Sequence, residues 1–421
     1  MQPPINIALI GAGNRGQGVF GQYGIDMPHR ARFVAVVDPV EKKRNRFGDE
    51  HSISPDKRFE NYEQFFETRD ERVDAVVIAT LENERKGPIF GAMKNGYHIL
   101  VEKPLGTDLK SVVEICDAAK AYSKIFMVCH QMRYTALYHT LKLAIDSGMY
   151  GRPISVQHSE NLSYHHMAHS FVRGLFSSSA LSPMILQKAC HDMDLIRWIV
   201  DSEPVDLSSY GSLLHFRQEN APVGAAERCL NNCPVERACP YSALKIYFSE
   251  DTDPAYLRQM GSPSTPSELR DALTANQFGR CVYNCDNDVV DNQVVIVRFK
   301  NGVTANFSMT GHNVLDRRIT KVSLTNGELE LDVSSGFIKA WTFHPSAYSI
   351  ITPESKDGSH LGGDMAIMNG FVDAIVGGDY KNVLTPVGMS LDSHVMAFAA
   401  EESRISGRSV NVAEFVESYR R

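Results

Sequence analysis

Two residues of this sequence have the chemistry needed to move a proton to or from an alcohol. Histidine titrates near neutral pH, so His191 could accept a hydroxyl proton without any tuning of its pKa. Lys103 could assist, either with a pKa lowered by burial or as a cation that stabilises the developing alkoxide. A single histidine is more often a packed residue, so both roles depend on the elements that position these side chains.

A glycine-rich turn near the N-terminus predicts a site for a dinucleotide that could accept the hydride of such an alcohol. Residues 5–10 suit a buried parallel strand, and the turn after them has the spacing G-x-G-x-x-G. A second strand over 33–37 ends in Asp38, whose carboxylate could bind the adenosine ribose and would repel the additional phosphate of NADP. We expect NAD, with NADP less favoured because Arg44 is near in sequence. The candidate cofactor residues in this region are Gly11, Gly13, Asn14, Arg15, Gly16 and Asp38.

Two further strands should complete the cofactor site. A strand over 75–79 ends at Thr80, and a strand over 98–101 is followed by Glu102, Lys103 and Pro104. Ligands bind at the carboxyl ends of strands in doubly wound sheets, so Thr80, Glu102 and Lys103 are predicted to face the nicotinamide. A surface Glu-Lys pair that merely ends a strand is the alternative.

The order of the predicted elements defines an α/β protein with two domains. Strands and helices alternate through residues 1–130, which predicts a doubly wound parallel sheet. Residues 131–421 should form the second domain, because Asn-Gly turns at 301–302 and 326–327 predict antiparallel hairpins. Helical periodicity over 365–376 and 391–405 completes this domain.

Composition excludes several classes of partner. The 421 residues are 43% hydrophobic and carry a formal net charge of −7, which leaves no basic surface for nucleic acid. The N-terminus lacks the basic region of a signal peptide, and no apolar run approaches the length of a membrane span. We therefore expect a cytoplasmic protein with no membrane or nucleic-acid partner.

Three motifs resemble those of the Gfo/Idh/MocA oxidoreductases, which act mostly on sugars and polyols: GAGNRG at 11–16, VEKPLG at 101–106 and CHDMDLIRW at 190–198. The resemblance implies a Rossmann domain followed by an α/β domain with a large, mostly antiparallel open sheet. That sheet would shield the substrate and often forms the interface of a homo-oligomer. Lys103 would contact the nicotinamide and the substrate hydroxyl, and His191 would be the acid/base.

The sequence departs from the family pattern at two positions. Gln187 stands where most members carry an aspartate, and Lys188 beside it could supply a second catalytic cation. Arg85 takes the place of a histidine in the loop after the third strand.

Three functions remain open from the sequence. The first is an NAD-dependent oxidoreductase that oxidises a secondary hydroxyl of a sugar or polyol. The alternative is a redox-neutral, NAD-dependent glycosidase or lyase that oxidises C3 transiently and then eliminates the leaving group. A sensor that binds NAD and a ligand without catalysis is the third, and no specific feature supports it.

A polar cluster over 160–173 predicts the carbohydrate site. We expect its side chains to be accessible, because a core would not tolerate so many hydrogen-bonding groups. There are two alternatives: a solvated loop, or a metal bound by His165 and His169, which have helical i, i+4 spacing. The candidate substrate residues are Tyr164, His165, His169, Arg173, Gln187 and His191, and the pairs His360 with Asp364 and Asp392 with His394 could close over a sugar.

Five cysteines cluster in a predicted insertion of about 219–288. Thiolates on loops can converge on a tetrahedral zinc, which would stabilise a segment with little core of its own. An iron–sulfur cluster, free thiols and disulfides are the alternatives, and a cytoplasmic location disfavours disulfides. Four ligands suffice for zinc, so one would be spare among Cys229, Cys233, Cys239, Cys281 and Cys285.

Overall fold

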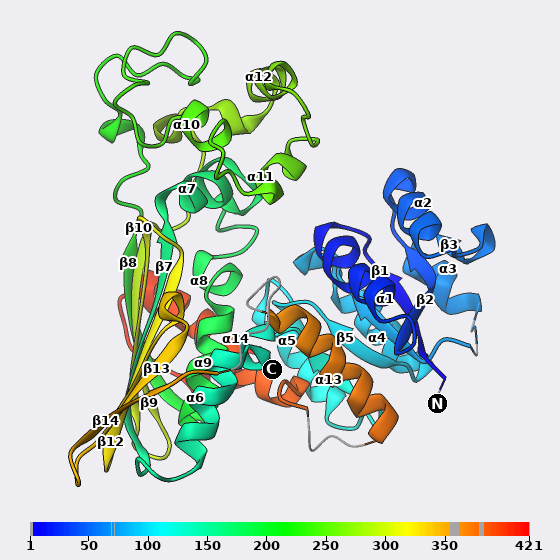
Figure 1. The fold of residues 1–421 in the computed structure, drawn as a ribbon, viewed down its shortest axis with the longest axis vertical. Helices are drawn as coiled ribbons and strands as arrows, with labels where there is room; N and C mark the ends of the chain where they lie inside the picture. The colour runs from blue at the N-terminus through cyan, green and yellow to red at the C-terminus, as the bar shows by residue number, and fades with distance from the viewer. Residues whose placement is uncertain (1–2, 69, 71, 354–361, 379–382, 421) are drawn as a thin grey trace.

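The chain folds into two β-sheets with helices around them (Figure 1). The computed structural model describes residues 3–68, 70, 72–353, 362–378 and 383–420. Within these ranges, no helix is both long and apolar enough to cross a membrane.

The first sheet is six-stranded and entirely parallel, with the strand order β3-β2-β1-β4-β5-β6. This is the doubly wound order of dinucleotide-binding folds, so the predicted fold class is confirmed. Its central strands are apolar runs because helices cover both faces of the sheet. The strands are β1 (Ile5–Ile10), β2 (Ala31–Val37), β3 (Arg58–Phe59), β4 (Ala75–Ile78), β5 (His98–Val101) and β6 (Phe126–Val128).

The helices of this part connect its parallel strands. The helix α4 ends at a glycine, because Gly96 directly after it adopts a left-handed φ of 73°. Asp108 caps the next helix by accepting a hydrogen bond from the Ser111 amide at 2.8 Å. The helices are the π-helical turn η1 (Gly16–Gly21), α1 (Gln22–Asp26), α2 (Glu41–Glu50), η2 (Pro55–Lys57), α3 (Tyr62–Thr68), η3 (Glu82–Glu84), α4 (Lys86–Asn95) and α5 (Leu109–Ala119).

A helix from near the C-terminus packs into the core of this N-terminal part. In α13 (Gly363–Gly377), Ile367 and Phe371 are buried in the same cluster as Leu9 of β1. The Tyr23 hydroxyl donates a hydrogen bond to Asn369 at 2.8 Å, and Figure 1 shows α13 beside the parallel sheet. A helix from the predicted second domain, α13, therefore packs as part of the first domain. A single domain boundary at residue 130 does not describe this arrangement.

The second sheet has nine strands in the order β14-β13-β12-β11-β7-β10-β9-β8-β15. Both predicted hairpins form: β9 pairs with β10, and β11 pairs with β12, across the two Asn-Gly turns. Among the described strands of this sheet, β7 and β10 are the one pair that runs parallel. The strands are β7 (Pro153–Ser163), β8 (Pro204–Ser212), β9 (Asn292–Phe299), β10 (Thr304–Asn313), β11 (Arg317–Leu324), β12 (Gly327–Asp332), β13 (Phe337–Thr342), β14 (Ala347–Ile351) and β15 (Val410–Asn411).

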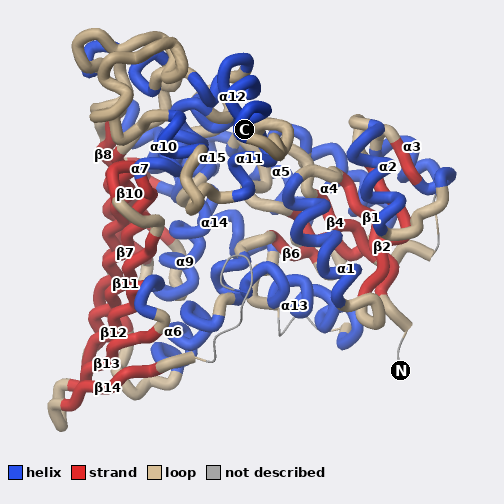
Figure 2. Tube along the Cα trace, turned by 45° about the horizontal axis from the view of Figure 1, so that its top comes forward, coloured by secondary structure: helices blue, strands red, loops and turns tan. Residues whose placement is uncertain are grey.

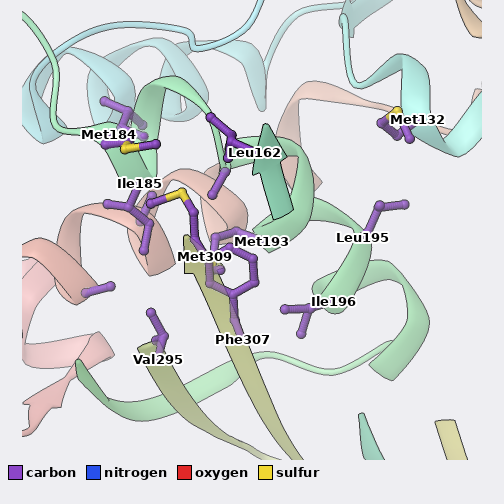
Figure 3. Close-up of a cluster of buried hydrophobic side chains, with 14 of the residues drawn as sticks. Met132, Leu162, Met184, Ile185, Met193, Leu195, Ile196, Val295, Phe307 and Met309 are labelled. Atoms are coloured by element: carbon purple, nitrogen blue, oxygen red, sulfur yellow. The ribbon is translucent and has the colours of Figure 1, made fainter. Parts of the chain in front are cut away.

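Helices cover one face of the nine-stranded sheet and leave the other face bare (Figure 2). In the core beneath them, Phe307 and Met309 of β10 lie beside Met193 of α9 (Figure 3). The helices of this part are η4 (Gln131–Tyr134), α6 (Ala136–Asp146), α7 (Tyr164–His166), the π-helical η5 (Met167–Arg173), η6 (Leu175–Ser177), α8 (Met184–Gln187), α9 (Cys190–Val200), η10 (Val333–Ser335), α14 (Val387–Ser406) and α15 (Val412–Arg420).

An insertion lies beyond one end of this sheet, at the top of Figure 1. β8 ends at Ser212 and β9 begins at Asn292, so the insertion occupies residues 213–291, slightly more than the predicted range. It contains η7 (Gln218–Asn220), α10 (Ala243–Tyr247), α11 (Pro254–Gln259), α12 (Pro266–Ala275), η8 (Gln277–Gly279) and η9 (Val282–Asn284).

Candidate active site

The glycine turn after β1 has the geometry of a pyrophosphate cradle. Gly11 has a φ of +100°, and a Cβ there would lie 2.7 Å from the Ala79 carbonyl carbon. A Cβ on Gly16 would lie 2.0 Å from the Gly11 carbonyl oxygen, so the first and third glycines are required by the close packing of strand and helix. A Cβ on Gly13 would meet nothing within 4 Å, which leaves that backbone open to a ligand. The turn therefore fits a dinucleotide.

The residues predicted for the two ends of the cofactor are also suitably placed. Both Asp38 carboxylate oxygens accept backbone amides, from Ala12 at 2.8 Å and from Val40 at 2.9 Å, which fixes the carboxylate at the end of β2. Arg44 donates to the Asp38 carbonyl oxygen at 2.5 Å. Beyond β4, the buried Thr80 hydroxyl has no hydrogen-bond partner within the described part of the chain, so it has capacity for a ligand. Asn14 is exposed at the tip of the glycine turn.

Arg15 and Glu102, both predicted to contact the cofactor, bind each other. The Arg15 guanidinium donates to Glu102 at 2.6 Å and to both carboxylate oxygens of Asp364, at 2.8 and 3.1 Å. These two carboxylates hold the pKa of Arg15 above its ordinary value despite burial. The bridge ties the glycine turn to the residue before Lys103 and to the first turn of α13, so Arg15 positions these elements.

Lys103 connects the two domains. Its Nζ donates a hydrogen bond to the Gln187 carbonyl oxygen at 2.9 Å, and its peptide bond to Pro104 is cis. Gln187 ends α8, four residues before His191 in the first turn of α9. The structure thus brings the predicted lysine from the parallel sheet to the segment that carries the predicted histidine.

Two buried side chains hold the loop that follows Lys103. Arg85, which replaces the histidine usual in the family, donates to the carbonyl oxygens of Thr80 and Pro104. His394 of α14 accepts the Leu105 amide at 2.9 Å through Nε2, while its Nδ1 lies 2.6 Å from the Ser390 carbonyl oxygen. His394 is fully buried, so it supports the loop from behind and does not close over a sugar.

His130 is a buried histidine beside His191 that sequence reasoning missed. Its ring lies 5.9 Å from the His191 ring and 5.8 Å from the His394 ring, between centroids. It is fully buried, and neither ring nitrogen has a hydrogen-bond partner within the described ranges. Burial, with the cations of Arg133 and Lys103, holds its pKa well below the ordinary value, although the Asp194 carboxylate lies 3.7 Å from Nε2. Its position just past β6, at the carboxyl edge of the parallel sheet, is the signal that could have revealed it.

Lys188 belongs to a chain of buried charges beside His191. Its Nζ lies 3.1 Å from Glu160, whose other oxygen pairs with Arg318 at 2.7 Å. Arg318 also donates to Asp192 at 2.7 Å, and His158 contacts the same carboxylate at 2.8 Å. Arg318 and His158 hold the pKa of Asp192 below its ordinary value. The acids thus balance the cations, and Lys188 remains partly exposed.

The polar cluster over 160–173 is accessible only in part, since Asn161, Tyr164, His165, His166 and Ser170 are half-buried. Glu160, His169 and Arg173 are buried, and each has at least one polar partner: Glu160 pairs with Lys188 and Arg318, His169 Nδ1 lies 2.9 Å from the Tyr247 hydroxyl, and Arg173 donates to carbonyl oxygens. The His169 ring stacks between Tyr256 at 3.8 Å and Phe278 at 4.7 Å, and burial lowers its pKa to about 3.

The predicted substrate residues therefore fall into two groups. Arg173 donates to the carbonyl oxygens of Arg280 and Tyr241, so it faces the insertion, as His169 does. Tyr164 and His165 are half-buried, and His165 Nδ1 lies 3.4 Å from the Tyr256 hydroxyl. The second group lies in one segment, which Lys103 contacts through the Gln187 carbonyl oxygen. It consists of Gln187, Lys188 and His191. The buried Gln187 side-chain oxygen has no hydrogen-bond partner in the described structure.

The remaining candidates have other partners or fall outside the structure. Asp392 accepts Arg197 at 2.7 Å, Asp364 pairs with Arg15, and His360 lies outside the described residues. All eight cysteines are free. Within the described residues no group of three or more His, Cys, Asp or Glu side chains is arranged to hold a metal ion, so the predicted zinc is not supported.

Comparison with known proteins agrees with this geometry. Residues 5–130 match the sequence model of the oxidoreductase family with an NAD-binding Rossmann fold, GFO_IDH_MocA. YteT of Bacillus subtilis (strain 168), an oxidoreductase by name, is 22% identical over 324 residues, which cover 70% of this chain and 71% of YteT. The scyllo-inositol 2-dehydrogenase (NAD(+)) of the same organism is 25% identical over 224 residues, or 51% of this chain and 59% of that enzyme.

A solved structure extends the likeness to the whole fold. Levoglucosan dehydrogenase, in complex with NADH and levoglucosan, superposes with a TM-score of 0.70 at 16% identity and covers 97% of this chain and 99% of its own. At that identity the likeness shows the fold. Residues 5–130 match the Gfo/Idh/MocA family model of oxidoreductases with an NAD-binding Rossmann fold.

Proposed function

We propose that this protein is an NAD-dependent oxidoreductase that transfers a hydride between a secondary hydroxyl of a sugar or polyol and nicotinamide. The observation that carries the proposal is the bond from Lys103 Nζ to the Gln187 carbonyl oxygen. It joins the carboxyl edge of the parallel sheet, where a dinucleotide binds, to the segment that bears His191. The names of the inositol and levoglucosan dehydrogenases support the substrate class.

The cofactor residues divide between its two ends. The backbone of Gly11, Gly13, Asn14 and Gly16 would hold the pyrophosphate, and Asp38 the adenosine ribose. Thr80 and Glu102 would face the nicotinamide, which accepts the hydride when NAD is bound. Because the Asp38 carboxylate is already held by two backbone amides, its fixed charge would repel the additional phosphate of NADP.

The chain's own side chains would handle the proton and the charge of the substrate oxygen. His191 would take the hydroxyl proton, because an imidazole accepts protons near neutral pH. The ammonium of Lys103 would stabilise the developing alkoxide and could exchange its present carbonyl partner for it. Lys188 would add a second cation, held in place by Glu160. The unpaired Gln187 oxygen would accept a hydrogen bond from a second substrate hydroxyl.

The bare face of the nine-stranded sheet supports a homo-oligomer. Tyr210 of β8 is directly opposite Val294 of β9, and both are exposed, as is Ile296 two residues further along β9. Val295 and Val297, which alternate with them on β9, are buried in the core, so the three exposed residues form an apolar patch on the opposite face of the sheet. Helices leave that face bare (Figure 2). We propose that a second copy of this chain covers it.

The eight free thiols support the cytoplasm as the cellular compartment of the protein.

Absorbance of reduced nicotinamide tests the proposed activity. The purified protein would be incubated with NAD and a panel of inositols, free sugars and aryl glycosides, with aglycone release followed in parallel. We expect net reduction of NAD by a polyol or free sugar, and its loss in Lys103→Met. Aglycone release without net reduction would instead establish a redox-neutral glycosidase.

A further inference from the structure

The insertion contains a long loop, residues 221–240, that has no buried side chains of its own. None of residues 221–240 is buried, and the segment contains neither a helix nor a strand. Long loops with no secondary structure are uncommon in compact domains unless something holds them. Three of the five clustered cysteines, Cys229, Cys233 and Cys239, lie in this loop.

Main-chain hydrogen bonds join this loop to the segment that carries the fourth cysteine. The Cys229 amide donates to the Gly279 carbonyl oxygen at 3.0 Å, and the Cys281 amide donates to the Glu227 carbonyl oxygen at 2.8 Å. Arg228 and Arg280 form an isolated antiparallel bridge between these contacts. Cys229 and Cys281, 52 positions apart in the chain, are therefore neighbours in the fold.

Four cysteines line one small cavity between these two segments. Its volume is about 20 Å³, and Cys229, Cys233, Cys239 and Cys281 all contribute to its wall. That volume accommodates one water-sized guest. Cys285 is not part of the wall, because its thiol donates to the Cys281 carbonyl oxygen at 3.2 Å. The structure thus separates four candidate ligands from one spare cysteine.

Two N–H donors lie near the sulfur of Cys229, and one of them belongs to Arg173, which also lines the cavity. The Ala243 amide lies 3.4 Å from Cys229 Sγ, and the Arg173 guanidinium lies 3.7 Å from the same sulfur. Arg173 also donates to the carbonyl oxygen of Tyr241, next to the loop, and to that of Arg280, next to Cys281, so a buried cation ties the two cysteine-bearing segments together. N–H donors of this kind stabilise sulfur that carries negative charge, as it does when it binds a metal.

We propose that Cys229, Cys233, Cys239 and Cys281 bind one thiophilic metal ion, which pins the loop of residues 221–240. Four thiolates form the tetrahedral set that zinc or a single iron prefers. In the described residues the side chains are not drawn together at metal-binding spacing, so they must turn inward around the ion. On binding, each coordinating thiol gives up its proton to solvent, and no electron transfer is involved.

Metal content of the purified protein tests the proposal without reference to NAD or to activity. We expect about one equivalent of zinc or iron per chain in the wild type, and less than about a tenth of that in Cys233→Ser and Cys239→Ser. Cys116→Ser is the matched control, because Cys116 is a buried cysteine of α5 outside the insertion, and it should keep the metal.

Trypsin cleavage after Arg237, which is exposed in the loop, gives a second readout. Chelation should speed this cleavage at least about tenfold, and added Zn²⁺ should reverse the effect in the wild type but not in Cys233→Ser. The proposal is overturned by a metal-free wild type whose cleavage does not respond to Zn²⁺, by disulfides among the four cysteines, or by several irons with acid-labile sulfide.

Discussion

Replacing His394 with leucine removes the acceptor that supports the loop after Lys103. The Leu105 amide donates to His394 Nε2 at 2.9 Å in a fully buried setting, and leucine fills a similar volume without an acceptor. Leaving a buried N–H unpaired costs about 1–3 kcal/mol, so His394→Leu should be less stable than the wild type by about that amount at pH 7.

The same substitution should change how stability depends on pH. Burial, together with the neighbouring His130, lowers the pKa of His394 from 6.5 to about 3. As the pH falls below 6.5, the unfolded chain binds a proton at this histidine that the folded chain does not, so the wild type loses stability. Between pH 7 and pH 5 this loss is about 2 kcal/mol. Leucine does not titrate, so the gap between wild type and variant should shrink by about that much.

Guanidinium unfolding of both proteins at pH 7 and pH 5 measures this gap. His394→Gln is the control, because its amide oxygen can accept the Leu105 amide but does not titrate. It should recover stability at pH 7 and show the same weak pH dependence as the leucine variant. A gap between wild type and His394→Leu that is equal at both pH values would refute the reasoning.

Other substitutions separate the roles assigned above. Lys103→Met and His191→Asn should each lower turnover by about 100-fold or more while leaving the affinity for NAD nearly unchanged. Stopped-flow kinetics would measure the turnover and fluorescence titration the affinity. A variant with unchanged turnover would show that its residue has no part in the mechanism. Asp38→Ala should weaken NAD binding and relax discrimination against NADP, whereas a variant with the wild-type preference would contradict the ribose assignment. Ile296→Glu should shift the light-scattering mass toward the monomer, because it places a charge in the apolar patch on the bare sheet; an unchanged oligomer would locate the interface elsewhere.

The parallel sheet could be predicted from the sequence because both of its faces are buried. Its strands are short apolar runs, and glycines and Asp38 mark where two of them end. The hairpins of the second sheet were predictable from Asn301-Gly302 and Asn326-Gly327. β7 was not, because His158 and Glu160 interrupt its apolar pattern at buried positions. Their partners Asp192 and Arg318 are distant in sequence, and only the fold shows that these charges are paired.

In the candidate site, too, some features could be predicted from the sequence and others could be found only in the fold. Lys103 and His191 lie in recognisable motifs, which is why the sequence nominates them as site residues. The contact that joins their segments could be found only in the structure. His169 was expected to be exposed because a polar side chain usually is. In the fold it is enclosed by the rings of Tyr256 and Phe278, which belong to the insertion and are distant in sequence. His130 carries no motif, and its significance comes from where the parallel sheet places it beside His191.

Deuterium tracing tests the central claim most directly. The protein would be incubated with NAD and polyols or sugars from the panel that carry deuterium on their carbinol carbons, and the reduced cofactor would be analysed by mass spectrometry. The account predicts that reduced nicotinamide accumulates, carries the deuterium, and fails to form in Lys103→Met. Product formation without any accumulation of labelled reduced cofactor would contradict it.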